Sequence, residues 1–257
     1  MVDTGEELIK ICREKSMKIW QYALLDEAKS TGVPEEKVFK KMKKNLEVMK
    51  QSSNYALTHN VKSVSGLIGG DAYKLNEYLE RQNSLTGNFM IKVMARALSC
   101  SEVNAAMGKI VAAPTAGSCG ILPAVVISSC EKLGKNDDEM VKALFTASCV
   151  GVLIAKNATL SGAEGGCQAE CGSAAAMAAA AVVEMMGGTP DMCLTAGAIV
   201  IKNVLGLVCD PVAGLVEIPC AKRNASGAVN AVAAADMVMA GVYSKIPFDD
   251  AVSALYD

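Results

Sequence analysis

The segment that decides the fold is Ser173-Ala-Ala-Ala-Met-Ala-Ala-Ala-Ala-Val-Val-Glu-Met-Met-Gly187, a run with almost no polar face. A helix that is apolar on every side has to be buried among other segments. Alanine side chains also allow neighbouring backbones to approach closely. The run therefore predicts a central helix that other helices enclose.

Apolar residues recur at helical spacing in most of the other segments. One amphipathic helix is predicted over residues 5–28, and a second from Pro34 to about Ser52. Further helices are expected over residues 72–81, 89–112, 138–157 and 189–207, one from about residue 122, and a last one up to residue 240. No alternating strand pattern exceeds a few residues. We expect an all-α fold, a single helical domain with a buried Ala-rich central layer and a site built from interhelical loops.

Composition excludes several classes of protein. The 257 residues are 51% hydrophobic but 4% aromatic, and the net charge is −2. This charge gives no argument for binding nucleic acid or an anionic membrane. The sequence shows no signal peptide and no convincing run of about 20 apolar residues. A cytoplasmic protein is therefore expected.

Ten cysteines are many for such a chain, and without an export signal a disulfide framework is not expected. Five lie in helix-like segments and are expected to fill the core as small apolar side chains: Cys12, Cys100, Cys130, Cys149 and Cys193. Five lie in predicted loops: Cys119, Cys167, Cys171, Cys209 and Cys220.

Three of the loop cysteines form a candidate metal site. Cys167, Cys209 and Cys220 each lie beside Gly or Pro near a predicted helix end, where backbone N–H groups can point at sulfur. Three thiolates would leave one iron of a [4Fe–4S] cluster open to a substrate hydroxyl and carboxylate. No Cys-x-x-Cys occurs, so by spacing alone buried structural cysteines remain the favoured alternative. A single histidine, His59, disfavours a histidine-based triad or zinc site.

Two glycine-rich segments are candidate anion sites. In Ala113-Pro-Thr-Ala-Gly-Ser-Cys-Gly-Ile-Leu-Pro123, two prolines bracket two glycines and the hydroxyls of Thr115 and Ser118. Exposed N–H groups and hydroxyls before a helix could hold a carboxylate, although an ordinary interhelical turn fits equally well. The loop Ser63-Val-Ser-Gly-Leu-Ile-Gly-Gly-Asp-Ala72 gives a weaker signal, for which a linker is the simpler interpretation.

Long motifs in the chain resemble the iron–sulfur-dependent L-serine dehydratases, specifically the α subunit or α catalytic domain. The resemblance covers about residues 60–250. The matching stretches are Ser65-Gly-Leu-Ile-Gly-Gly-Asp71, Asn104-Ala-Ala-Met-Gly-Lys-Ile-Val-Ala-Ala-Pro-Thr-Ala-Gly-Ser-Cys-Gly120, Gly165-Gly-Cys-Gln-Ala-Glu170 and Cys209-Asp-Pro-Val-Ala-Gly-Leu-Val-Glu-Ile-Pro-Cys-Ala-Lys-Arg-Asn224.

The resemblance implies a lyase of amino-acid degradation and gluconeogenesis that converts L-serine to pyruvate and ammonia. It implies a [4Fe–4S] cluster bound by Cys167, Cys209 and Cys220, and it sets Cys119 and Cys171 aside as structural thiols. The substrate-binding residues that it implies are Ser65, Thr115, Ala116, Gly117, Ser118 and Asn224. The expected domain spans 1–257, with amphipathic helices in 1–58 and the cluster- and substrate-binding core in 60–250.

The sequence departs from the family pattern at three places. It lacks the Ser-Ser-His-Thr segment of the family's β subunit or β domain, so the catalytic base is unknown here and a separate β subunit is the expected partner. The chain stops at Asp257, where family α chains run on, and residue 68 is Ile where Thr is expected. Two alternatives are an iron–sulfur L-cysteine desulfidase-like lyase and a non-catalytic helical partner subunit.

Overall fold

The computed structural model describes residues 2–81 and 84–256, and in these ranges the chain forms helices and no β-strand. The prediction of an all-α fold is confirmed. The helices are α1 (Gly5–Glu14), α2 (Ile19–Thr31), α3 (Glu35–Thr58), α4 (Asp71–Leu79), α5 (Gly87–Ala105), α6 (Ile121–Lys132), α7 (Asp137–Asn157), α8 (Gly162–Met185), α9 (Pro190–Val204), α10 (Cys220–Met239) and α11 (Phe248–Tyr256), with one 3-10 turn, η1 (Val212–Gly214).

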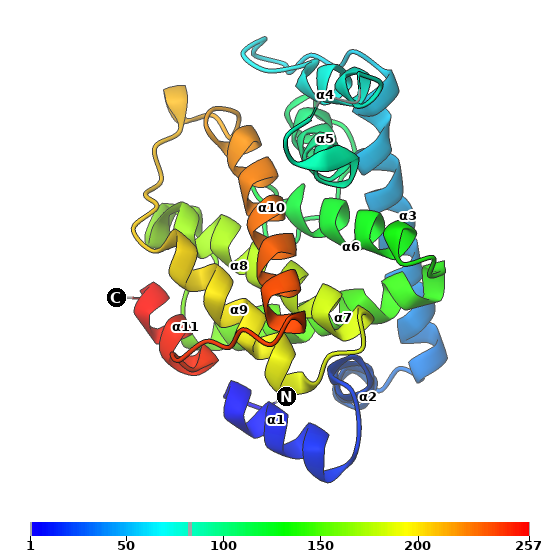
Figure 1. Ribbon diagram of the computed structural model, residues 1–257, viewed down its shortest axis with the longest axis vertical. Helices are drawn as coiled ribbons and strands as arrows, with labels where there is room; N and C mark the ends of the chain where they lie inside the picture. The colour runs from blue at the N-terminus through cyan, green and yellow to red at the C-terminus, as the bar shows by residue number, and fades with distance from the viewer. Residues whose placement is uncertain (1, 82–83, 257) are drawn as a thin grey trace.

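The helix α8 is the centre of the fold, as its composition predicts. Every residue from Cys171 to Met185 is buried, and α6, α7, α9 and α10 pack around it (Figure 1). Small residues permit these contacts: a Cβ at Gly172 would lie 2.9 Å from a methyl carbon of Val204 on α9. The Ala-rich run therefore works as a thin spacer that brings four helices close together.

Two predicted helices have the wrong extent, and one helix is missing from the prediction. The helix expected over 5–28 breaks between Glu14 and Ile19, where Ser16 takes a φ of 49°. The helix expected over 89–112 ends at Ala105, because the chain turns and the Gly108 amide donates to the Val103 carbonyl as a C-terminal cap. The helix α11 was not predicted at all.

The single acidic residue of the central run, Glu184, caps another helix. Its side chain is 4% exposed. It accepts hydrogen bonds from the amides of Ile19 at 2.6 Å and Trp20 at 3.3 Å, and from the hydroxyl of Thr146. These amides are the first of α2, which have no partner within their own helix. The break after α1 thus exposes a helix N-terminus that a buried carboxylate satisfies.

Replacing Glu184 with glutamine is expected to change how stability depends on pH. Burial raises the pKa of Glu184, because the charged carboxylate loses solvation. The folded chain then holds this proton more tightly, so the contribution is complete below the unfolded pKa of about 4.3 and is lost as pH rises through the raised folded value. Urea unfolding from about pH 4.5 to about pH 8 should show the wild type losing stability relative to E184Q, by about 1.4 kcal/mol per pKa unit. Parallel curves would contradict this assignment.

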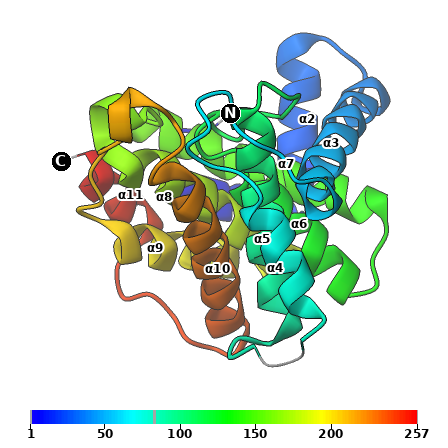
Figure 2. The same cartoon turned by 90° about the horizontal axis from the view of Figure 1, so that it is seen from above.

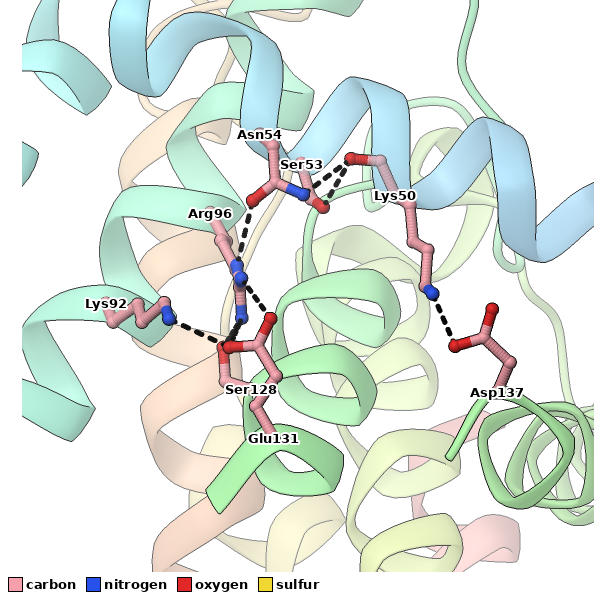
Figure 3. Close-up of polar contacts among 8 residues, drawn as sticks. All are labelled: Lys50, Ser53, Asn54, Lys92, Arg96, Ser128, Glu131 and Asp137. Carbon is pink, nitrogen blue, oxygen red and sulfur yellow. Dashed lines mark hydrogen bonds and ion pairs between the residues drawn. The ribbon is translucent and has the colours of Figure 1, made fainter. Parts of the chain in front are cut away.

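A buried cation joins three other helices. Arg96 on α5 has a side chain that is 4% exposed and donates to both carboxylate oxygens of Glu131 on α6, at 2.9 and 2.7 Å. It also donates to the Ser128 hydroxyl at 3.0 Å and to Asn54 on α3 at 3.3 Å (Figure 3). A two-pronged Arg–carboxylate pair fixes orientation as well as distance. The contacts of Arg96 therefore hold α3, α5 and α6 together, and the glycine-rich turn lies between α5 and α6.

Candidate active site

Three cysteine-bearing segments meet at one end of the molecule: the first turns of α8, the first turn of α10, and the chain between α9 and α10, which we call the 205–219 linker. Gln168 on α8 joins the first and last of these. Its amide donates to the Leu207 carbonyl at 3.0 Å, and its side-chain oxygen accepts from the Gly206 amide at 2.6 Å. Figure 2 shows the linker lying over the starts of α8 and α10.

A kink at Gly166 brings the linker against α8. Its φ of 75° and ψ of −178° interrupt the helix, and a Cβ there would lie 2.8 Å from the Leu207 carbonyl oxygen. Only glycine takes this conformation readily and leaves that space. Cys167 therefore begins the regular part of a helix, and the prediction that it lies in an interhelical loop is wrong. Cys220 also lies on a helix, as the first residue of α10, whereas Cys209 lies in the linker.

The three predicted ligands lie close enough to influence one another. Cys167 and Cys220 are buried and Cys209 is exposed. Burial, followed by the neighbouring charge of Cys167, raises the pKa of Cys220 to about 11, and the same two causes raise the pKa of Cys209. In the described part of the chain, however, no three His, Cys, Asp or Glu side chains already form a metal-binding group.

Cys167 differs from the other thiols in its surroundings. A hydrogen bond with Cys171 and another from Arg223, whose Nη1 lies 3.1 Å from its sulfur, lower the pKa of Cys167 to about 6 despite burial. The same contact raises the pKa of Cys171. A low pKa favours the thiolate, which is the form of cysteine that binds metals and reacts as a nucleophile.

The other seven cysteines are buried, as expected of core residues. Burial is the main cause of a raised pKa in all of them except Cys171, and it raises the pKa of Cys12 to about 11 and that of Cys100 to about 12. These seven are Cys12, Cys100, Cys119, Cys130, Cys149, Cys171 and Cys193.

The site fits an iron–sulfur cluster in donor chemistry and in the convergence of the donors. Three thiols come from three segments that are joined by direct contacts, and the exposed Cys209 lies outside regular helix. Thiolates are the usual protein ligands of such clusters. These observations concern the donor set and its location, and the ligand assignment itself stays a prediction.

The glycine-rich turn of residues 115–120 is occupied by a carboxylate of the chain itself. The hydroxyl of Thr115 donates to Glu170 on α8. A Cβ at Gly117 would lie 2.9 Å from the carboxyl carbon of Glu170, so glycine leaves the space that the carboxylate fills. The hydroxyls of Thr115 and Ser118 lie 3.1 Å apart. The turn predicted to cradle a carboxylate can therefore hold one.

Asn224 fixes this turn to α10. Its side chain is fully buried, accepts from the Gly120 amide at 2.9 Å, and donates to the carbonyls of Gly117 at 2.7 Å and Cys220 at 2.9 Å. Both amide hydrogens and the oxygen are thus engaged. The structure gives Asn224 a positioning role between the turn and a cysteine, and direct contact with substrate stays a prediction.

Ser65 contacts the linker at Glu217. This exposed residue donates its hydroxyl to Glu217 at 2.7 Å. Near it, Lys222 on α10 forms an ion pair with Asp71 at the start of α4. The loop of residues 63–71 is therefore attached to the linker and to α10, and Ala116 is held from α5 by a hydrogen bond from Asn104 at 3.1 Å.

Sequence reasoning assigned no role to Glu170, Arg223 or Glu217, which all contact predicted site residues. A usable signal was present for two of them. Glu170 and Arg223 follow Cys167 and Cys220 by three positions, and on a helix such residues share a face. Interpreting the Cys167 region as a loop concealed this spacing.

Comparison with known proteins shows the family of the chain. Residues 14–257 match the model of the family described as serine dehydratase alpha chain. The chain belongs to the serine dehydratase alpha-chain family. Its relatives include the L-serine dehydratase, alpha chain, of Peptoniphilus asaccharolyticus, 49% identical over 99% of this chain and 87% of that protein. The probable L-serine dehydratase, alpha chain, of Bacillus subtilis is also 49% identical, over 98% of this chain and 83% of that protein.

In a longer relative, the region similar to this chain is one part of the protein. The L-serine dehydratase of Streptomyces coelicolor is 36% identical over 98% of this chain, which covers 56% of that protein. Among the helices that the structure describes, none combines the length and apolar character needed to cross a bilayer. Membership of the alpha-chain family and the arrangement of the site are the basis for the function of the chain.

Proposed function

We propose that this chain is the catalytic α subunit of a cytoplasmic L-serine dehydratase, a lyase that converts L-serine to pyruvate and ammonia. Membership of the alpha-chain family supports the reaction class. The observation that carries the proposal is the junction of three cysteine-bearing segments beside a turn that accommodates a carboxylate. A serine substrate needs both features, because one of its ends is a carboxylate and the other is the hydroxyl that leaves.

Cys167, Cys209 and Cys220 would hold a [4Fe–4S] cluster in this proposal. When bound, such a cluster would supply a Lewis acid that favours departure of the substrate hydroxyl. The chain's own residues bind and orient the substrate. The hydroxyls of Thr115 and Ser118 receive the substrate carboxylate, while Asn224 keeps the turn in register with Cys220.

Substrate binding requires Glu170 to release Thr115. Two carboxylates cannot share one hydroxyl donor at close range without strong repulsion. Glu170 lies on α8, one turn beyond Cys167, so its displacement would take place beside the thiols. The proposal therefore gives Glu170 the role of holding the turn until substrate arrives.

The base that removes the substrate proton is expected on a β subunit. The chain has one histidine, and His59 lies at the end of α3, where its Nδ1 is 2.9 Å from the Tyr55 carbonyl oxygen and its ring stacks on that tyrosine. It lines a separate cavity together with Gln51 and Lys109.

The decisive test is co-expression with a β subunit under anaerobic conditions, followed by an assay for pyruvate from L-serine. Wild type should be active, and Cys209→Ser should lose activity and iron, because serine is a poor ligand for cluster iron. Ala213, which is exposed in the same linker, provides a matched control as Ala213→Ser. Equal activity of C209S and wild type would refute the ligand assignment. A higher kcat/KM for L-cysteine than for L-serine would refute the substrate.

A further inference from the structure

One guanidinium group touches all three segments that carry the candidate ligands. Nη1 of Arg223 lies 3.1 Å from the Cys167 sulfur on α8, 3.0 Å from the Val208 carbonyl oxygen and 2.5 Å from the Asp210 carboxylate. Val208 and Asp210 flank Cys209 on either side. Arg223 itself follows Cys220 by three positions on α10, so the two residues share one face of that helix.

We propose that Arg223 is a positioning residue that assembles the three-cysteine site before a cluster binds. The inference rests on the proposed function, because it assumes that these thiols are ligands. Cys209 is exposed in a linker that lacks α-helix, so its own side chain does little to fix its place. The contacts of Arg223 to both neighbours of Cys209 supply that constraint from α10.

The positive charge of Arg223 also suits a site that would gather anionic sulfur ligands. Three thiolates brought together repel one another, and each must lose its proton to bind metal. Arg223 is 17% exposed, so its charge is screened less than that of a surface lysine. Arginine stays protonated at all relevant pH values, and its planar group can donate in several directions at once. Its permanent charge offsets part of the repulsion among the thiolates.

The preceding residue provides a matched comparison. Lys222 carries the same charge at the start of α10, but its ammonium pairs with Asp71 at the start of α4. If only the positive charge near α10 were important, replacing Lys222 or Arg223 would have the same effect on the cysteine site. If the contacts of Arg223 are important, only the replacement of Arg223 affects that site.

The test uses the αβ complex purified anaerobically, with α chains carrying Arg223→Gln, Arg223→Lys or Lys222→Gln. Iron and sulfide are supplied for reconstitution, and retention of iron is then measured against a chelator. R223Q should lose iron about 10- to 100-fold faster than wild type, the usual effect of losing a group that orients metal ligands. R223K should fall between them and K222Q should match wild type. The reduction potential of any retained cluster should be lower in R223Q, because a positive charge and a hydrogen bond to sulfur are removed.

A second readout does not depend on a cluster. Hydrogen exchange of metal-free complexes should show faster exchange of backbone amides in the 205–219 linker for R223Q, and wild-type exchange for K222Q. Wild-type iron retention and linker protection in R223Q would overturn the positioning role while leaving the proposed function intact. A wild-type complex that binds no iron would instead refute the proposed cofactor, and this inference with it.

Discussion

Replacing Cys167 with serine is expected to remove most of the iron from the reconstituted enzyme and to lower kcat/KM for L-serine by about 1,000-fold or more, equivalent to several kcal/mol of lost transition-state stabilisation. Cys167 combines burial, a thiol pKa of about 6 and a contact with Arg223, so it is the candidate ligand that most readily supplies a thiolate. Iron content and pyruvate formation, measured anaerobically on the αβ complex, test this expectation.

Cys171 supplies the matched control, because it lies one helical turn further along α8 and is also buried. Cys171→Ser places a hydroxyl in the core and should cost about 1–3 kcal/mol of folding stability. It should nevertheless retain iron, since this thiol is not among the predicted ligands and its pKa is raised. Loss of iron from C171S but not from C167S would show that Cys171 is the ligand and that Cys167 is the structural thiol.

Replacing Asn224 with alanine is expected to destabilise the chain by about 3–5 kcal/mol and to abolish serine binding. The substitution removes three hydrogen bonds in a fully buried position and leaves the Gly120 amide and the Gly117 carbonyl without these partners. Urea unfolding measures the first effect. The substrate-induced change in the cluster spectrum measures the second, which follows because the turn is no longer fixed beside Cys220.

Asn224→Asp separates geometry from simple loss of volume. An aspartate can accept from Gly120, but when ionised it cannot donate to either carbonyl and instead repels both. It should therefore be as harmful as alanine at neutral pH, although its size is that of asparagine. Asn230→Ala, on the same helix and only partly buried, should cost about 1 kcal/mol or less. Equal effects of N224A and N230A would show that Asn224 has no special role in the turn.

The glycine-rich turn of residues 115–120 already contacts a carboxylate of the protein, with which a substrate carboxylate would compete. The sequence indicated a cradle of small residues and hydroxyls, and an interhelical turn was an equal alternative. The structure combines the two interpretations, because this interhelical turn already holds the carboxylate of Glu170 through Thr115. Specificity for a small carboxylate would then arise from competition with a side chain of the protein, and Gly117, which leaves room for the Glu170 carboxylate, sets the available space.

The fold was largely predictable because helical periodicity and small residues act locally. Thr189 and Pro190 begin α9 as predicted, with the Thr189 hydroxyl accepting from the Met192 amide. The errors arose where tertiary contacts override local pattern. Ser16 has no glycine or proline to mark the turn after α1, and Gly165-Gly166 suggested a loop although the helix continues on the far side of a kink.

The sequence by itself determined the donor chemistry, the buried Ala-rich helix and the hydroxyl-bearing turn, since these follow from residue type and short spacing. Only the tertiary structure decided which groups meet. Arg223 contacts Cys167 across 56 residues, Thr115 contacts Glu170 across 55, and Ser65 contacts Glu217 across 152. Local rules reach about one helical turn, so contacts over such separations exist only once α8, α10 and the linker have packed together.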